Sequence, residues 1–134
     1  MQRSFKRELG SLALLFEFSK EAAVRFGLDE ETVYAVDLSV EELFTNMVKY
    51  GGGGAEVSVG IGVDGEDLVV ELVHPGATPF DVSTGGQVDI HMPLAGRVPG
   101  GIGLHLVRRV MDDVSYAHEN GAARITLKKR LGGH

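Results

Sequence analysis

The chain has 134 residues, of which 19 are glycine and four are proline, and no three-residue glycine repeat runs through it. This composition excludes collagen-like and proline-rich proteins, while 43% hydrophobic residues suffice for the core of a single globular domain. The net charge of −6 argues against general nucleic-acid binding, which depends on basic side chains, and the absence of cysteine excludes disulfides, thiolate metal sites and a cysteine nucleophile.

The amino-terminal segment predicts an amphipathic helix over residues 6–26. Apolar residues recur there at helical spacing between charged ones, and Gly27 follows as a carboxyl-terminal cap. The expected apolar stripe consists of Leu9, Leu12, Ala13, Phe16, Ala23 and Phe26. The compact apolar run at residues 12–16 is too short for a secretory signal or a membrane-spanning helix, so we expect a cytoplasmic protein without membrane contact.

A second helix is expected over residues 30–50. Asp29 is its N-cap, and Glu30 and Glu31 favour its first turn. Four successive glycines, residues 51–54, end it, because glycine loses more backbone entropy in a helix than any other residue. Its expected apolar stripe consists of Val33, Val36, Val40, Leu43 and Met47.

Beyond these glycines the hydrophobic period changes from that of a helix to that of strands. Residues 57–63 and 68–72 alternate on either side of Asp64-Gly65, which predicts an antiparallel hairpin with one buried face. A third helix near residues 104–111 and a second hairpin turned at Asn120-Gly121 follow. Residues 74–100 lack strong periodicity, which indicates a functional lid or an element that the pattern does not reveal.

These elements predict a single α+β domain over residues 1–134. We expect a two-layer sandwich in which a mixed, mostly antiparallel sheet is covered on one face by about three helices. Functional residues are expected where the glycines meet the aperiodic segment.

Glu42 and Asn46 lie one turn apart on one face of the second helix, beside its apolar stripe. A carboxylate and an amide oxygen in this arrangement suit Mg²⁺, directly or through water, and the carboxylate can also accept a proton from a nucleophile. Taken alone, the pair is better explained as an ordinary solvated helix face.

Two glycine-containing segments are candidates for ligand contact. Gly100, Gly101 and Gly103 open the third helix, whose amino-terminal amides and dipole favour phosphate oxygens. After the first hairpin, Gly76 would let the backbone approach a flat ligand, and Phe80 would anchor the returning loop. The alternatives are a flexible loop end and a simple turn. The sequence contains neither a dinucleotide fingerprint nor a P-loop.

In combination, these segments resemble the three sequence boxes of the GHKL ATPase and kinase superfamily. The boxes are Glu42-x-x-x-Asn46 on a helix, x-x-Gly76-x-x-Pro79-Phe80-Asp81 after a strand, and Gly100-Gly101-x-Gly103-Leu104 opening a helix. Over nearly its whole length the chain is most similar to the anti-sigma-factor serine/threonine kinases. The resemblance implies the Bergerat ATP-binding fold, ATP and Mg²⁺ as cofactors, and a lid at about residues 81–99.

The resemblance also implies roles for residues at matching positions. Asn46 would coordinate Mg²⁺, Glu42 would activate the attacking hydroxyl, and Arg97 at the end of the lid would stabilise phosphate charge. The other implied nucleotide-binding residues are Lys49, Tyr50, His74, Gly76, Phe80, Gly100, Gly101, Gly103 and Leu104. His74 stands where the family usually has an Asp that receives the adenine amino group, and Tyr50 stands where many members have His.

The implied activity is transfer of a phosphoryl group from ATP to a Ser or Thr of an antagonist protein of the STAS type, which regulates a sigma factor. Pairing of the chain as a homodimer is also expected. The alternative is a catalytically weak or inactive nucleotide-dependent binding switch, because a neutral His74 imidazole accepts only one hydrogen bond and lacks the charge of a carboxylate. A fragment of an ATP-hydrolysing sensor kinase is the least favoured alternative, because we expect no phosphoacceptor helix pair before the domain.

Overall fold

The computed structural model describes residues 1–50, 56–76 and 101–131. Its strands are β1 (Gln2–Lys6), β2 (Glu56–Asp64), β3 (Asp67–Pro75), β4 (Asp113–Glu119) and β5 (Ala122–Arg130). Its helices are the 3-10 turn η1 (Leu9–Ser11) and the α-helices α1 (Leu12–Phe26), α2 (Glu30–Tyr50) and α4 (Gly101–Val110). None of the helices in these ranges is long and apolar enough to cross a membrane.

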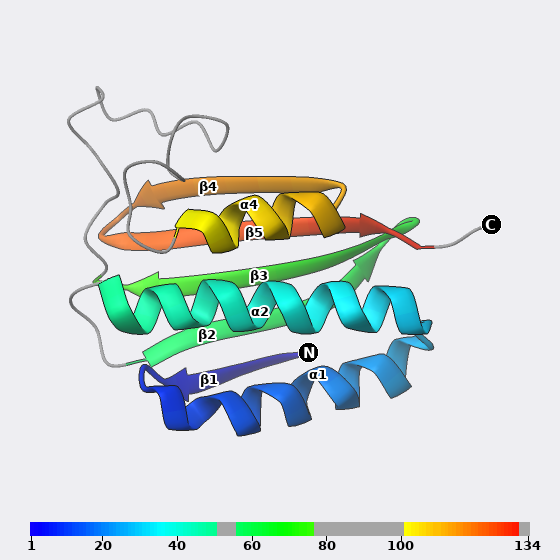
Figure 1. The fold of residues 1–134 in the computed structure, drawn as a ribbon, viewed down its shortest axis with the longest axis horizontal. Coiled ribbons are helices and arrows are strands. Elements are labelled where there is room, and N and C mark those ends of the chain that lie inside the picture. The colour runs from blue at the N-terminus through cyan, green and yellow to red at the C-terminus, as the bar shows by residue number, and fades with distance from the viewer. Residues whose placement is uncertain (51–55, 77–100, 132–134) are drawn as a thin grey trace.

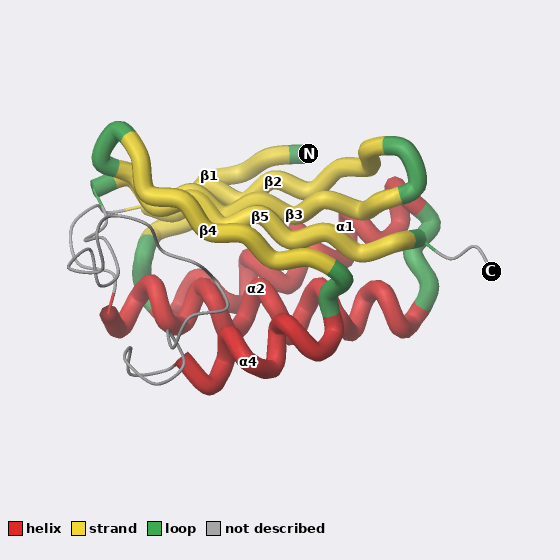
Figure 2. Tube along the Cα trace, turned by 90° about the horizontal axis from the view of Figure 1, so that it is seen from above, coloured by secondary structure: helices red, strands yellow, loops and turns green. Residues whose placement is uncertain are grey.

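The described elements form two layers, with α1, α2 and α4 on one face of the sheet (Figures 1 and 2). The strand order is β1-β2-β3-β5-β4, and each pairing between neighbours in this order is antiparallel. The predicted two-layer α+β sandwich is therefore confirmed. The predicted lid, residues 81–99, lies outside the described residues.

The amino-terminal segment differs from its prediction. Residues 2–6 form strand β1, paired with β2 from Gln2↔Gly60 to Lys6↔Glu56, and α1 begins only at Leu12. The expected stripe is also rotated: Leu9 is 50% exposed and Ala13 is exposed. The residues of α1 that are buried are Leu15, Phe18, Ser19 and Ala22.

A long-range contact explains this difference in α1. Phe5 of β1 is buried and packs edge-on against Phe18, with 5.8 Å between the ring centroids. Its position is set by pairing with Val57, far along the chain. The face that α1 buries therefore follows from the sheet rather than from its own apolar spacing. The predicted end of α1 is confirmed, because Gly27 adopts a left-handed conformation with φ +64°.

Helix α2 agrees with its prediction. The Asp29 carboxylate accepts a hydrogen bond from the Thr32 amide at 2.8 Å, which confirms the N-cap. Hydrogen bonding to Thr32 also lowers the pKa of Asp29. Four residues of the expected stripe, Val36, Val40, Leu43 and Met47, are buried, whereas Val33 is only partly buried.

Both hairpins are confirmed, with strands longer than the pattern indicates. The first turns through Gly65 at φ +64°, and the second turns through Asn120 and Gly121 at φ +54° and +76°. Positive φ at both central residues matches the right-handed twist of the strands, which explains the Asn-Gly sequence. Val63 beside the first turn is 45% exposed, contrary to its expected burial, because it lies at the end of the strand.

One hydrophobic core lies between the helices and the sheet. Its fully buried members include Leu15, Phe18, Val40, Phe44, Val57, Val59, Leu72, Val107 and Leu127. Helices α2 and α4 contact each other on the helix-covered face of the sheet (Figure 2).

Candidate nucleotide-binding site

The predicted site residues that the structure describes come from three elements. These are the carboxyl-terminal half of α2, the end of β3 and the start of α4, which lie toward the same end of the sandwich (Figure 1). Helix α2 contacts α4 directly. Segments far apart in the sequence therefore lie toward one end of the fold (Figure 1).

Glu42 and Asn46 are both partly buried on α2. Each directly precedes a buried core residue, Leu43 and Met47 respectively. Their backbone is thus fixed by packing while the polar groups lie at the edge of the core, as expected. Lys49 is exposed in the last turn of the same helix.

His74 is 1% exposed and is the most deeply buried of the described site residues. It continues the alternation of Leu68, Val70 and Leu72, so its imidazole lies on the helix-covered face of the sheet. The pattern did not reveal this extension of β3, because a histidine breaks an otherwise apolar series. A neutral imidazole in such a place can donate one hydrogen bond and accept another.

Gly76 follows β3 in a left-handed conformation, with φ +76°. Its amide donates a hydrogen bond to the carbonyl of Gly121, in the turn between β4 and β5, at 2.6 Å. Side chains rarely adopt this backbone conformation, so the chain requires a glycine here even without a ligand.

Helix α4 begins at Gly101, so Gly101, Gly103 and Leu104 lie in its first turns, as expected for a phosphate-binding amino terminus. The first turn contains no acidic residue, and the last turn carries Arg108 and Arg109. This distribution leaves the positive end of the helix dipole available to an anion.

Five of the predicted features lie outside the described part of the structure. They are Phe80, Arg97, Gly100 and the side chains of Tyr50 and Leu104. Within the described ranges, no group of three His, Asp or Glu side chains comes together to hold a metal. The oxygens of Asn46 and Glu42 nevertheless suit Mg²⁺, because this ion needs only one or two protein ligands and completes its shell with waters and substrate phosphates.

Arg7 is a further residue at this end of the fold, and the sequence pattern had placed it on the first helix. Its guanidinium Nη1 donates to the carbonyl oxygens of Met47 at 3.0 Å and Val48 at 3.1 Å. No local signal marks such a contact, because its partners lie about 40 residues away.

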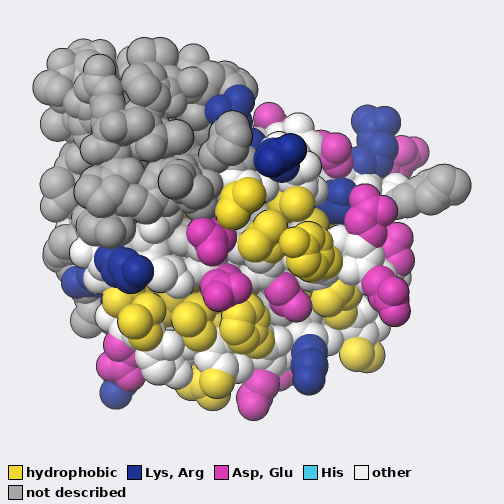
Figure 3. Space-filling model, viewed as in Figure 1, with side chains coloured by type: hydrophobic (Ala, Val, Ile, Leu, Met, Phe, Trp, Pro, Cys, Tyr) yellow, Lys and Arg dark blue, Asp and Glu magenta, His cyan; other side chains and the backbone are white. Residues whose placement is uncertain are grey.

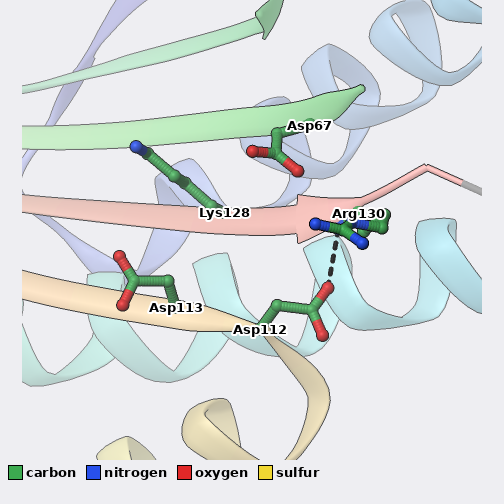
Figure 4. A pocket seen from close by; sticks show the side chains of 5 residues that line it. All are labelled: Asp67, Asp112, Asp113, Lys128 and Arg130. Atoms are coloured by element: carbon green, nitrogen blue, oxygen red, sulfur yellow. Dashed lines mark hydrogen bonds between the residues drawn. The ribbon is translucent and has the colours of Figure 1, made fainter. Parts of the chain in front are cut away.

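A shallow pocket of about 350 Å³ lies at the opposite end of the sheet (Figure 4). Its lining residues are Asp67, Asp112, Asp113, Lys128 and Arg130. Asp112 accepts a hydrogen bond from the backbone amide of Arg130 at 2.6 Å, which ties β5 to the start of β4. None of the predicted site residues lines this pocket.

The antiparallel sheet under three helices, with Glu42 and Asn46 beside a glycine-opened helix, is the arrangement of the GHKL ATP-binding fold. A profile of the histidine kinase-like ATPase domain matches residues 5–129, so the chain belongs to that family. The resemblance inferred from the sequence boxes is thereby confirmed.

Relatives of the chain support the same assignment. The serine-protein kinase RsbW of Listeria monocytogenes is 29% identical over 119 residues, covering 79% of this chain and 71% of the relative. In a solved structure of the RsbU and RsbW domains of a Mycobacterium tuberculosis protein, the match covers 100% of this chain and 33% of that one, with a TM-score of 0.68 and 14% identity. A chain of the SiaB–SiaC complex from Pseudomonas aeruginosa matches with a TM-score of 0.61 and 14% identity, over 98% of this chain and 89% of that one. The two structural matches show the fold.

Proposed function

We propose that the chain binds ATP with Mg²⁺ and transfers the γ-phosphoryl group to a Ser or Thr of an antagonist protein that controls a sigma factor. One observation carries the proposal. In a member of the histidine kinase-like ATPase family, the carboxyl-terminal half of α2, which carries Glu42 and Asn46, lies toward the same end of the fold as the end of β3 and the glycine-opened start of α4 (Figure 1). The RsbW relatives, named serine-protein kinases, support protein phosphorylation in particular.

Glu42, Asn46 and the start of α4 each have a defined part in this reaction. The Asn46 amide oxygen would hold Mg²⁺, which would neutralise phosphate charge, and the amides at the start of α4 would bind phosphate oxygens. The partner's hydroxyl oxygen attacks the γ-phosphorus and its proton passes to the Glu42 carboxylate. The bond from the γ-phosphorus to the oxygen bridging it to the β-phosphate breaks, and ADP leaves with that oxygen.

The surface charge favours basic segments on the partner. The helix-bearing face carries acidic side chains interspersed with apolar ones (Figure 3). The exposed acids of α1 and α2 are Glu17, Glu21, Glu30, Glu31 and Glu41. Complementary charge accelerates association and selects partners. We propose a sigma factor as one of these partners. We also propose that the chain forms a homodimer and acts in the cytoplasm.

A single-turnover assay with radiolabelled ATP and a purified antagonist protein carrying a surface Ser tests the proposal. Glu42→Gln is expected to bind ATP as the wild type does and to lose transfer by about 10²–10⁴-fold, the usual contribution of a general base. Glu41→Gln, an exposed neighbour on α2, is the matched control and is expected to transfer normally. Full transfer by Glu42→Gln would remove this residue from the role of base.

By the sequence resemblance, the buried His74 stands where the family usually has an Asp, and this substitution favours a second candidate function, a nucleotide-dependent binding switch without transfer. The same assay separates the two functions. ATP binding by the wild type with no label on the antagonist supports the switch, whereas label on the antagonist excludes it.

A further inference from the structure

The carboxyl-terminal turn of α2 is held by a residue from the other end of the chain. Arg7 Nη1 donates to the carbonyl oxygens of Met47 and Val48, at 3.0 and 3.1 Å. These carbonyls are among the last four of the helix, a position at which carbonyl groups lack a partner amide within the helix. The guanidinium is partly buried, and its positive charge lies at the negative end of the helix dipole, which strengthens both bonds.

The backbone around Arg7 is itself fixed by the sheet. Arg7 directly follows Lys6, the last residue of β1. Phe5 is 4% exposed and packs edge-on against Phe18. On the other side, the Glu8 amide donates to the Lys6 carbonyl at 2.8 Å. The guanidinium is therefore brought to α2 from a rigid strand end.

The sequence after α2 cannot supply an equivalent side-chain cap. Residues 51–54 are all glycine, which carries no side chain and favours unwinding of a helix end. Asn46 directly precedes Met47, so the bonds from Arg7 fix the backbone of the turn that carries its carboxamide.

We propose that Arg7 is a positioning residue of the nucleotide site. By holding the carbonyls of Met47 and Val48, it fixes the Asn46 carboxamide in place for ATP and Mg²⁺. This inference rests on the proposed function. Removal of a group that orients a metal ligand typically lowers metal affinity about 10–100-fold.

Three variants test the inference: Arg7→Met, Arg7→Lys and, as a matched loss of one positive charge, Arg25→Met on the exposed last turn of α1. Amide hydrogen exchange is measured on the nucleotide-free protein, and ATP is titrated by calorimetry with and without Mg²⁺. In Arg7→Met we expect faster exchange confined to the last turn of α2 and loss of Mg²⁺-dependent ATP affinity by about 10-fold or more. The exchange rate and the Mg²⁺-dependent ATP affinity of Arg7→Lys are expected to lie between those of Arg7→Met and the wild type, because an ammonium keeps the charge without the planar fork. Both quantities should be unchanged in Arg25→Met.

Three results would overturn the inference. Unchanged exchange in Arg7→Met would show that the contact does not hold the helix end. Faster exchange with unchanged Mg²⁺-dependent affinity would reduce Arg7 to a structural cap. An equal loss of affinity with and without Mg²⁺ would show an effect that does not pass through Asn46. If the wild type binds no nucleotide, the proposed function and the positioning role both fail. The exchange measurement needs no nucleotide, so it still shows whether Arg7 holds the end of α2.

Discussion

The two ends of α2 are stabilised by different kinds of contact. At the amino end, the Asp29 carboxylate accepts a hydrogen bond from the amide of Thr32, three residues further along the chain. At the carboxyl end, the carbonyl of Met47 accepts one from Arg7, 40 residues away. The first contact can form in an isolated helix, whereas the second requires β1 to be paired in the sheet. The proposed catalytic residues lie toward the second end, so the geometry of the site depends on the completed fold.

The largest expected effect comes from removing the anchor of β1. Phe5→Ala deletes a buried ring that packs on Phe18 and should lower the free energy of unfolding by about 3–5 kcal/mol, measured by urea denaturation. Amide exchange should rise more at the carboxyl end of α2 than at its amino end. Leu14→Ala, at a side chain 57% exposed on α1, is the control and should change stability by less than about 0.5 kcal/mol. An equal rise in amide exchange at the two ends of α2 in Phe5→Ala would break the comparison between them.

A smaller and purely functional effect is expected from Asn46→Ala. Loss of the amide oxygen should reduce ATP affinity in the presence of Mg²⁺ by at least about 10-fold, since even outer partners of a metal contribute that much. ATP affinity without Mg²⁺ should change little, because the lost oxygen is proposed to act through the metal. Calorimetric titration measures the affinities, with Glu41→Ala on the exposed face as control. An unchanged titration with Mg²⁺ would contradict the assignment of Asn46.

The smallest effect is expected at the amino end. Hydrogen bonding to Thr32 lowers the pKa of Asp29 from 3.8 in the folded protein, so the ionised cap stabilises the fold above that value. Asp29→Ala should therefore lower the melting temperature at pH 7. The difference from wild type should fade as the pH drops below 3.8 and through the lowered pKa.

Asp29→Asn serves as the control, because asparagine also caps helices but does not titrate. Its stability should stay close to that of the wild type at pH 7. A difference between wild type and Asp29→Ala that persists unchanged in acid would show that the cap does not act through the carboxylate.

Local signals explain why most of the fold could be predicted. Asp29, the glycines after α2 and Asn120-Gly121 each fix a boundary through their own backbone preferences. Strand β1 escaped prediction because only Phe5 among its five residues is buried, which leaves no alternation to detect. The fully buried residues of α1 include Phe18, which packs on Phe5 of β1, and the predicted stripe lies beside them: its members Leu12, Phe16 and Phe26 pack against the core while only partly buried.

The candidate site likewise contains some residues that the sequence could reveal and others that it could not. Glu42, Asn46 and the glycines of α4 could be found because each belongs to a short motif on one element. Arg7 could not, since its contact with α2 joins residues that meet only in the folded chain. The burial of His74 likewise depends on how far β3 extends under the helices.

The conformation of Gly76 affects how related sequences should be interpreted. Because its left-handed backbone and its bond to Gly121 serve the joint between β3 and the second hairpin, a family member that had lost nucleotide binding would still be under pressure to keep this glycine. Glu42 and Asn46 lie at the edge of the core, in ordinary helical backbone that does not require glycine. Their retention or loss among homologues is therefore the better marker of which members still act on ATP.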